Sequence, residues 1–227
     1  MKFITFYFYY LFSFIKVKIK KLFFISFKKD TIPNKPQFSY KDLTYFKKLI
    51  KNKKNIIEYG MGGSTIYLIK SNKNLVSVET DKNFLEIIKS KLHNIRLNKS
   101  ILFYENIGET NLWGYPIDNR INKKNLNRWK KYVKSPWKYI KSKNFPNVIL
   151  IDGRFRVACA VLALKKIKFK RQSLVFFDDF NKRDYYNDVL KVAKVIKKLD
   201  RASILKPKKI SDKIFDNLIE KFSKDLK

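Results

Sequence analysis

The stretch that most restricts how this chain can fold is residues 55–65, NIIEYGMGGST, because it holds three of the six glycines in the sequence. Apolar residues precede the glycines and a helix-like segment, 65–70, follows them, which predicts a strand, a tight turn and a helix start. Glycine permits positive φ and close approach of a ligand to the backbone, and a helix start offers free N–H groups. The pattern predicts a cofactor-binding loop made by Gly60, Gly62, Gly63 and Ser64.

Two carboxylates indicate which cofactor such a loop would bind. Glu58 lies two residues before Gly60 and could bind a cationic amino group, directly or through water. Glu79 ends the next apolar run and could accept both hydroxyls of a ribose. A dinucleotide pattern starting at Gly60 is incomplete, because Thr65 stands where its third glycine belongs. S-adenosylmethionine has the amino group and the ribose but no phosphate, and is the predicted cofactor. An ordinary strand-to-helix turn without a ligand is the alternative.

The formal charge of +33 raises the question of a nucleic-acid partner. Lysines supply most of this charge and are scattered through nearly every segment, whereas phosphate-binding proteins usually concentrate charge on one face. The chain is also rich in Ile, Asn, Phe and Tyr, which share AT-rich codons with Lys. A specific nucleic-acid partner is therefore disfavoured but not excluded, and non-specific attraction of polyanions is expected at low salt. The single cysteine, Cys159, indicates a reducing, cytoplasmic location.

Residues 1–37 are predicted to be separate from a main domain at 38–227. Residues 3–15 are almost entirely apolar, and lysines are frequent through 16–29. The apolar run is about half of the roughly 20 residues that span a bilayer. Two interpretations are open. Residues 1–29 could contact anionic lipid at the inner face of the membrane, or they could form an element packed on the domain.

Short apolar runs alternate with helical patterns along the main domain. Strands are expected at 55–59, 75–78, 101–104, 148–151, 174–177 and 202–205. Helices are expected after Ser39 and at 65–70, 82–92, 126–143, 155–167, 186–199 and the C-terminus. This order predicts a single Rossmann-like, doubly wound α/β domain with a mainly parallel sheet and helices on both faces. A seventh strand is not evident, because little strand-like sequence follows Pro207.

Polar residues follow the expected strands, at the edge of the sheet where such folds bind ligands. They are Glu58, Glu79, Glu105, Asn106, Asp152, Asp178 and Asp179. The three aspartates would repel one another if they converged. This repulsion could be neutralised by Mg²⁺ bound to Asp152, Asp178 and Asp179. It could also be neutralised by the nearby Arg154, Arg156 and Arg183. Structural roles in turns and helix caps are the third interpretation.

The glycine motif, Glu79 and the block IDGRFRVA at 151–158 together resemble class I S-adenosylmethionine-dependent methyltransferases, in particular an uncharacterised bacterial branch with an Asp-Gly-Arg-Phe-Arg block. The resemblance covers roughly residues 55–205. It implies that the Glu58 loop holds the methionine part of the cofactor, that Glu79 holds the ribose, and that Asn106 lies near the adenine. The aspartate trio is also similar to the metal ligands of catechol-type O-methyltransferases, although the third ligand there is commonly Asn.

These patterns predict a methyltransferase that acts on a small polar acceptor, with a hydroxyl of a saccharide or related metabolite as the expected target. Asp152 is the predicted central residue, as base or metal ligand. Arg154 and Arg156 are expected to contact the substrate, and Trp113 and Tyr115 to form an aromatic wall. Trp129 could belong to that wall or to the core. The alternatives are an RNA methyltransferase and a non-catalytic protein that binds membrane surfaces or polyanions on the same fold.

Overall fold

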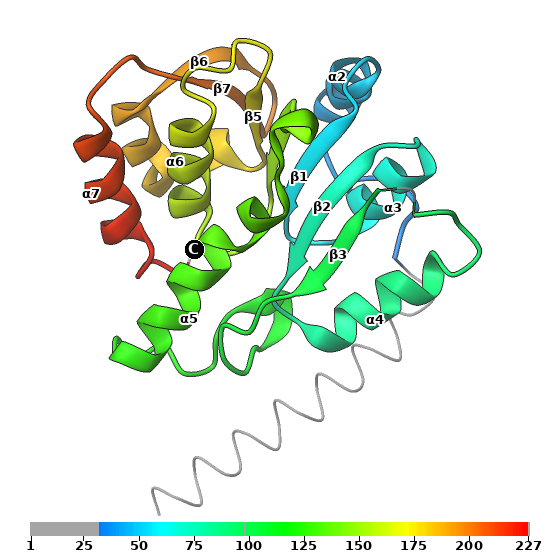
Figure 1. The fold of residues 1–227 in the computed structure, drawn as a ribbon, viewed down its shortest axis with the longest axis horizontal. Helices are drawn as coiled ribbons and strands as arrows, with labels where there is room; N and C mark the ends of the chain where they lie inside the picture. The colour runs from blue at the N-terminus through cyan, green and yellow to red at the C-terminus, as the bar shows by residue number, and fades with distance from the viewer. Residues whose placement is uncertain (1–31, 98, 227) are drawn as a thin grey trace, which may run out of the picture.

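The computed structural model describes residues 32–97 and 99–226, so the predicted membrane contact through residues 1–29 lies outside the described residues. The domain is built on one seven-stranded sheet with the order β3-β2-β1-β4-β5-β7-β6 (Figure 1). The strands are β1 (Asn55–Tyr59), β2 (Asn74–Glu79), β3 (Ile101–Tyr104), β4 (Val148–Ile151), β5 (Leu174–Phe177), β6 (Ala193–Lys198) and β7 (Ser203–Pro207). The first five are parallel, whereas β7 runs antiparallel to both of its neighbours. The predicted Rossmann-like fold class is confirmed.

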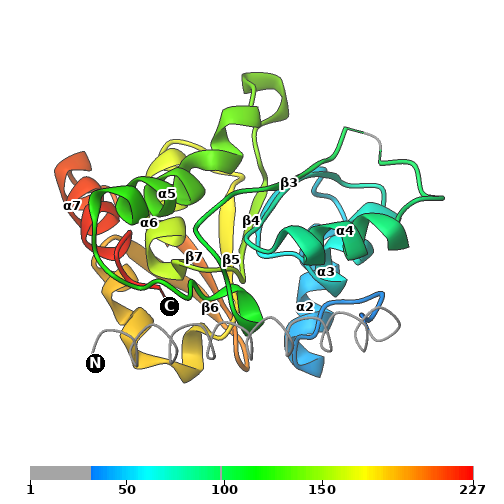
Figure 2. The same ribbon diagram turned by 90° about the horizontal axis from the view of Figure 1, so that it is seen from below.

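Helices cover both faces of this sheet (Figures 1 and 2). One face packs against α2 (Tyr40–Ile50), α3 (Gly63–Lys70) and α4 (Lys82–Lys91), and the other against α5 (Lys123–Lys134), α6 (Arg156–Lys166) and α7 (Asp212–Phe222). Short 3₁₀ turns are η1 (Leu112–Gly114), η2 (Ser135–Tyr139), η3 (Ser142–Asn144), η4 (Phe180–Lys182) and η5 (Asp184–Lys191). Successive strand residues alternate between the two cores, as in Ile56 and Ile57, because a strand has a side-chain period of two.

The predicted helix at 186–199 is wrong. Its residues instead form the 3₁₀ turn η5 and the edge strand β6, which pairs with β7 as an antiparallel hairpin. Hairpin pairing prevails over the helical spacing of Tyr186, Val189 and Ala193, because the adjacent β-branched Val195 and Ile196 favour an extended strand. The seventh strand therefore comes before residues 203–207, not after Pro207. Lysines such as Lys197 on exposed β6 protect this edge from pairing with another chain.

The hairpin turn is held against α2 by one buried carboxylate. Asp42 is fully buried and accepts hydrogen bonds from the backbone N–H groups of Asp200 (2.8 Å), Arg201 (2.9 Å) and Ala202 (3.1 Å). Ser39 caps α2 as its sequence predicts, but Asp42 serves this distant turn. The contact fixes the backbone from which the Arg201 side chain extends toward the carboxyl ends of the strands.

No helix within residues 32–97 and 99–226 combines the length and the apolar character needed to cross a bilayer.

Candidate functional site

The predicted site residues meet because parallel strands end in register. Tyr59 lies between Val78 and Ile151 in the sheet, and Ile151 pairs with Phe177. The residues that follow these positions are Gly60, Glu79, Asp152 and Asp178. The chain order reverses between β1 and β4, which is the switch point where open α/β sheets bind ligands. A pocket of about 640 Å³ opens there, a size typical of small-molecule sites.

Each of the three loop positions is occupied by glycine for a different structural reason. Gly60 has φ +86°, and a Cβ on it would lie 2.7 Å from Cα of Gly153 in the loop after β4. A Cβ on Gly63 would overlap the carbonyl oxygens of Lys35 and Pro33. Only Gly62 faces open space, with no heavy atom within 4 Å of a built Cβ. Gly60 and Gly63 thus permit close packing of the chain against itself, and Gly62 leaves the room that a ligand needs.

Glu58 lies beneath the loop and does not line the pocket. It is fully buried and accepts hydrogen bonds from the hydroxyls of Ser64 (2.6 Å), Thr65 (2.7 Å) and Ser77 (2.6 Å). Burial raises the pKa of Glu58 to about 7, although the three hydroxyls oppose the shift. The structure therefore does not bring Glu58 to the predicted contact with an amino group. Its carboxyl group anchors the first turn of α3 on the sheet, and Ser64 lines the pocket above it.

The pKa of Glu58 predicts a pH-dependent stability. Between pH 4.5 and about 7 the folded chain keeps a proton on Glu58 that the unfolded chain loses, so the free energy of unfolding falls as pH rises through this window. Glu58→Gln removes this titration. Across the window, the free energy of unfolding of the variant should therefore fall by about 3 kcal/mol less than that of the parent. Urea unfolding of both proteins at several pH values measures the difference. Parallel stability curves would contradict the assignment.

Glu79 joins the end of β2 to the glycine loop and lines the pocket. Its Oε2 accepts from the Met61 N–H at 3.0 Å, and its Oε1 accepts from the N–H groups of Thr80 (2.6 Å) and Asp81 (3.0 Å). Burial raises the pKa of Glu79, and these backbone donors oppose the shift. The Thr80 hydroxyl also donates to Oε1 at 3.2 Å, so Oε1 is fully used, whereas among the described residues Oε2 accepts only from Met61 and can still accept from one ligand hydroxyl.

Arginines neutralise the aspartate cluster. Asp152 Oδ1 accepts from Arg156 Nη2 at 2.8 Å. Asp179 forms ion pairs with Arg156 (3.5 Å), Arg183 (2.8 Å) and Arg201, whose Nε donates to it at 2.8 Å. Among the residues that the structure describes, no group of three His, Cys, Asp or Glu side chains is arranged to hold a metal ion. The residues present therefore do not fit the predicted Mg²⁺ site, and arginine neutralisation, the alternative interpretation, describes the cluster.

The three aspartates differ in protonation. Burial, with the charges of Asp152 and Asp179, raises the pKa of Asp178 to about 8. Burial also raises the pKa of Asp152, against the opposing effect of Arg156. Burial disfavours the charge of Asp179 as well, but the hydrogen bond and charge of Arg201, with Arg156 and Arg183, lower its pKa. Within the described part of the chain, Asp178 Oδ1 is buried without a hydrogen-bond partner. Asp178 lines the pocket, and while its Oδ2 lies 3.4 Å from Arg201 Nη2, its Oδ1 remains an unused acceptor among the described residues.

The predicted aromatic wall is built by the loop before α5, drawn in green near the centre of Figure 2. Trp113 and Tyr115 both line the pocket, whereas Trp129 is fully buried in the core. Backbone hydrogen bonds close the loop, with Asn111 N–H donating to Tyr115 C=O at 2.8 Å. Trp113 is 68% exposed and has φ +66°, a conformation that is strained for a large side chain. Such strain is often found at functional sites.

Arg154 and Arg156 line the same pocket but differ in their partners. Arg156 donates to the carbonyl oxygens of Gly153 and Asp178 and to the Asp152 carboxylate, so its donors are used within the protein. The guanidinium of Arg154 stacks on the Tyr115 ring with 4.0 Å between its Cζ and the ring centroid. In the described chain the Nη1 of Arg154 is buried and has no hydrogen-bond partner.

The structure does not bring Asn106 to the pocket. Its side chain is exposed, and its Oδ1 accepts from the Gly108 N–H at 2.8 Å. The neighbouring Glu105 forms an ion pair with Lys131 at 2.7 Å. The wall beside Glu79 comes instead from Phe84 and Ile87 of α4.

Sequence reasoning missed two parts of the pocket. Residues 31–37 look like a linker, yet Ile32, Pro33, Gln37 and Phe38 line the pocket. Phe38 stacks on Phe176 at 5.2 Å between ring centroids, and this aromatic residue after two prolines is the signal that could have identified the wall. Arg201 is the second omission, and no local pattern marks it, because it lies in the turn of the unpredicted hairpin.

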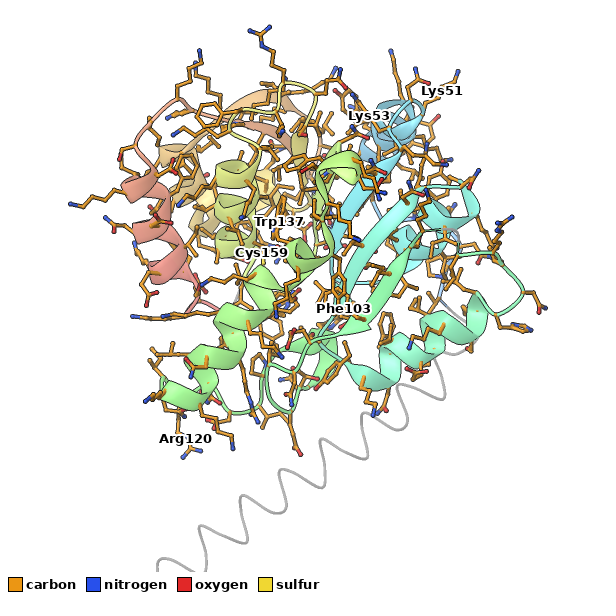
Figure 3. All side chains as sticks on the ribbon, viewed as in Figure 1. Lys51, Lys53, Phe103, Arg120, Trp137 and Cys159 are labelled. Carbon is orange, nitrogen blue, oxygen red and sulfur yellow. The ribbon has the colours of Figure 1, made fainter. Side chains whose placement is uncertain are left out.

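Basic side chains are spread over the surface. Figure 3 shows Lys51 and Lys53 at the end of the molecule that carries α2, with Arg120 at the opposite end. This distribution agrees with the scattered charge of the sequence and gives no specific support to a nucleic-acid interface.

No family model matches the chain, and no curated protein matches its sequence. Solved structures do. A methyltransferase-like protein from Silicibacter pomeroyi superposes with a TM-score of 0.68 at 23% identity, over 83% of this chain and 97% of that chain. A candidate caffeoyl-CoA O-methyltransferase from Staphylococcus aureus (TM-score 0.45, 15% identity, 88% and 98% covered) and the 16S rRNA methylase ArmA (0.35, 12%, 73% and 80%) match more weakly. The first match shows a methyltransferase-like fold, and the reaction has to be argued from the site.

Proposed function

We propose that this chain is an S-adenosylmethionine-dependent methyltransferase that acts on a hydroxyl of a small polar acceptor, such as a saccharide or a related metabolite. The observation that carries the proposal is the composition of one pocket at the switch point of the sheet. The open face of Gly62 and the carboxylate of Glu79 lie in the same pocket as Asp178, whose Oδ1 has no partner in the described chain.

The glycine-loop half of the pocket suits the cofactor. Oε2 of Glu79 would accept from a ribose hydroxyl, and the backbone at Gly62 and Gly63 would lie against the methionine part. Phe84 and Ile87, which replace Asn106 in this proposal, would supply an apolar wall for the adenine. Glu58 would act indirectly by holding the first turn of α3.

The opposite half suits an acceptor hydroxyl. S-adenosylmethionine supplies a methyl group that its sulfonium makes electrophilic. The chain positions the acceptor in line with that methyl group, an alignment that supplies much of the rate in a displacement. We assign the proton acceptor to Asp178 in place of the predicted Asp152. Asp152 Oδ1 accepts from Arg156 at 2.8 Å, whereas Asp178 is paired more weakly, through Oδ2 with Arg201 at 3.4 Å, and its Oδ1 has no hydrogen-bond partner in the described chain. A pKa of about 8 also matches Asp178 better to a hydroxyl than an ordinary carboxylate would be.

Calorimetric titration with S-adenosylmethionine and with S-adenosylhomocysteine tests the cofactor assignment. The parent should bind each in a 1:1 ratio. Glu79→Ala should weaken binding by about 1.5–3 kcal/mol, because hydrogen bonds to a charged group are lost. Glu86→Ala is the matched control, since it removes one carboxylate from an exposed position on α4 and should bind as the parent does. Absence of binding by the folded parent would overturn the proposal and favour the non-catalytic alternative.

Two finer predictions are retained as proposals. RNA is an alternative acceptor. The second proposal is that residues 1–29 contact anionic lipid at the inner face of the membrane. Liposome flotation of the full chain and of a chain lacking residues 1–29 tests the lipid contact. Equal flotation of both would contradict it.

A further inference from the structure

Four arginines line the pocket, and three of them are neutralised. Arg156, Arg183 and Arg201 form ion pairs with the aspartates of the cluster. Arg154 forms no ion pair with any residue in the described ranges, although it is only 7% exposed. An unpaired, buried guanidinium is uncommon in a folded protein, because a buried charge requires a partner or a hydrogen-bonding ligand.

The surroundings of Arg154 hold its guanidinium in place without using its donors. One face stacks on Tyr115 at 4.0 Å, which leaves the in-plane N–H groups for hydrogen bonding. Cγ of Arg154 would lie 4.0 Å from a Cβ built on Gly114, so the aromatic-wall loop packs along the stem. The backbone N–H of Arg154 lies 3.4 Å from the hydroxyl of Tyr132, which also lines the pocket. The side chain is thus fixed between the loop and the sheet, with Nη1 unsatisfied.

From this geometry we infer that the acceptor carries an anionic group, a carboxylate or a phosphate, that binds to the guanidinium of Arg154. This inference rests on the proposed function and specifies its substrate class. The planar guanidinium forms paired hydrogen bonds with the two oxygens of such a group, which fixes orientation as well as charge. An acid bound at Arg154 presents the remainder of the molecule, including its hydroxyl, to the pocket that Asp178 lines. Asp178 and Arg154 therefore recognise opposite features of one acceptor, a hydroxyl to be methylated and a fixed negative charge.

The net charge of the chain makes non-specific anion binding the main confounding effect, so the test requires a charge-matched control. The full chain is titrated with inorganic phosphate and, separately, with acetate, at constant ionic strength. Binding is followed through the Nε–Hε resonance of Arg154 in ¹H–¹⁵N spectra and by calorimetry. Arg154→Gln removes the proposed contact. Arg96→Gln lowers the net charge equally at an exposed position outside the pocket.

We expect saturable binding of at least one anion by the parent and by Arg96→Gln, with at least a 10-fold loss in Arg154→Gln. Arg154→Lys keeps the charge but lacks the planar guanidinium, so it is also expected to lose affinity. It replaces Arg154→Gln in the test if that variant does not fold. Tighter binding of phosphate would indicate a phosphorylated acceptor, and tighter binding of acetate a carboxylic acid. Equal binding by the parent and Arg154→Gln, or equal losses in Arg154→Gln and Arg96→Gln, would overturn the inference.

The cofactor titration separates this inference from the proposed function. Binding of S-adenosylhomocysteine without anion binding at Arg154 would refute the acidic acceptor alone. Anion binding at Arg154 without cofactor binding would leave an anion site in a protein that is not a methyltransferase.

Discussion

Asp178→Asn is expected to lower kcat for methyl transfer by about 10²–10⁴-fold, the usual contribution of a general base. Asn keeps the shape of the side chain but cannot accept the proton of the acceptor hydroxyl. Transfer of a radiolabelled methyl group from S-adenosylmethionine to hydroxy acids and sugar phosphates measures the effect. Asp152→Asn should lose less, because Asp152 acts on Arg156 rather than on the acceptor in the proposed mechanism.

The pH profile gives a second measurement of the same assignment. Because the unprotonated carboxylate accepts the proton, the parent rate should rise with pH and level off above about 8, the pKa of Asp178. The Asp178→Asn variant should lack this rise. S-adenosylmethionine affinity should be unchanged in the variant, because Glu79 and the glycine loop lie on other strands. A variant that keeps the parent rate and profile would exclude Asp178 as the base.

Gly62→Leu and Gly60→Ala should separate ligand binding from folding. A side chain on Gly62 meets no heavy atom within 4 Å of its Cβ and extends into the open pocket. Gly62→Leu should therefore fold normally but bind S-adenosylmethionine about 10–100-fold more weakly, the cost of overfilling a fitted site.

Gly60→Ala should instead destabilise the fold by about 2–5 kcal/mol, because a Cβ collides with the backbone of Gly153 at a positive φ. Urea unfolding and calorimetry of both variants measure the two effects. A Gly62→Leu variant with parent affinity would show that the cofactor does not lie against this loop. A Gly60→Ala variant with parent stability would contradict the close packing of the two loops.

Local sequence determined the framework of this protein. Apolar runs located six of the seven strands, and Ser39 located the start of α2, because these signals depend on neighbouring residues. Parallel strands end at one edge, so the acidic residues after them could be assigned to one site before the structure was known. The exception was β6, where helical spacing and strand-forming residues overlapped and only pairing with β7 decided between them.

Tertiary structure decided which hydrogen-bond donors and acceptors of each site residue remain free to bind a ligand. Glu58 and Glu79 look equivalent in the sequence, but three hydroxyls enclose Glu58 whereas Glu79 lines the pocket. Arg154 and Arg156 are two positions apart, yet only Arg156 reaches the aspartates. Arg201 neutralises Asp179 from a turn that Asp42 fixes across more than 150 residues of sequence. The sequence by itself placed most of the predicted residues at the carboxyl ends of the strands, but it did not exclude Glu58 and Asn106 from the pocket or find Arg201. The free donors and acceptors of the site residues depend on contacts between distant segments, which only the folded chain brings together.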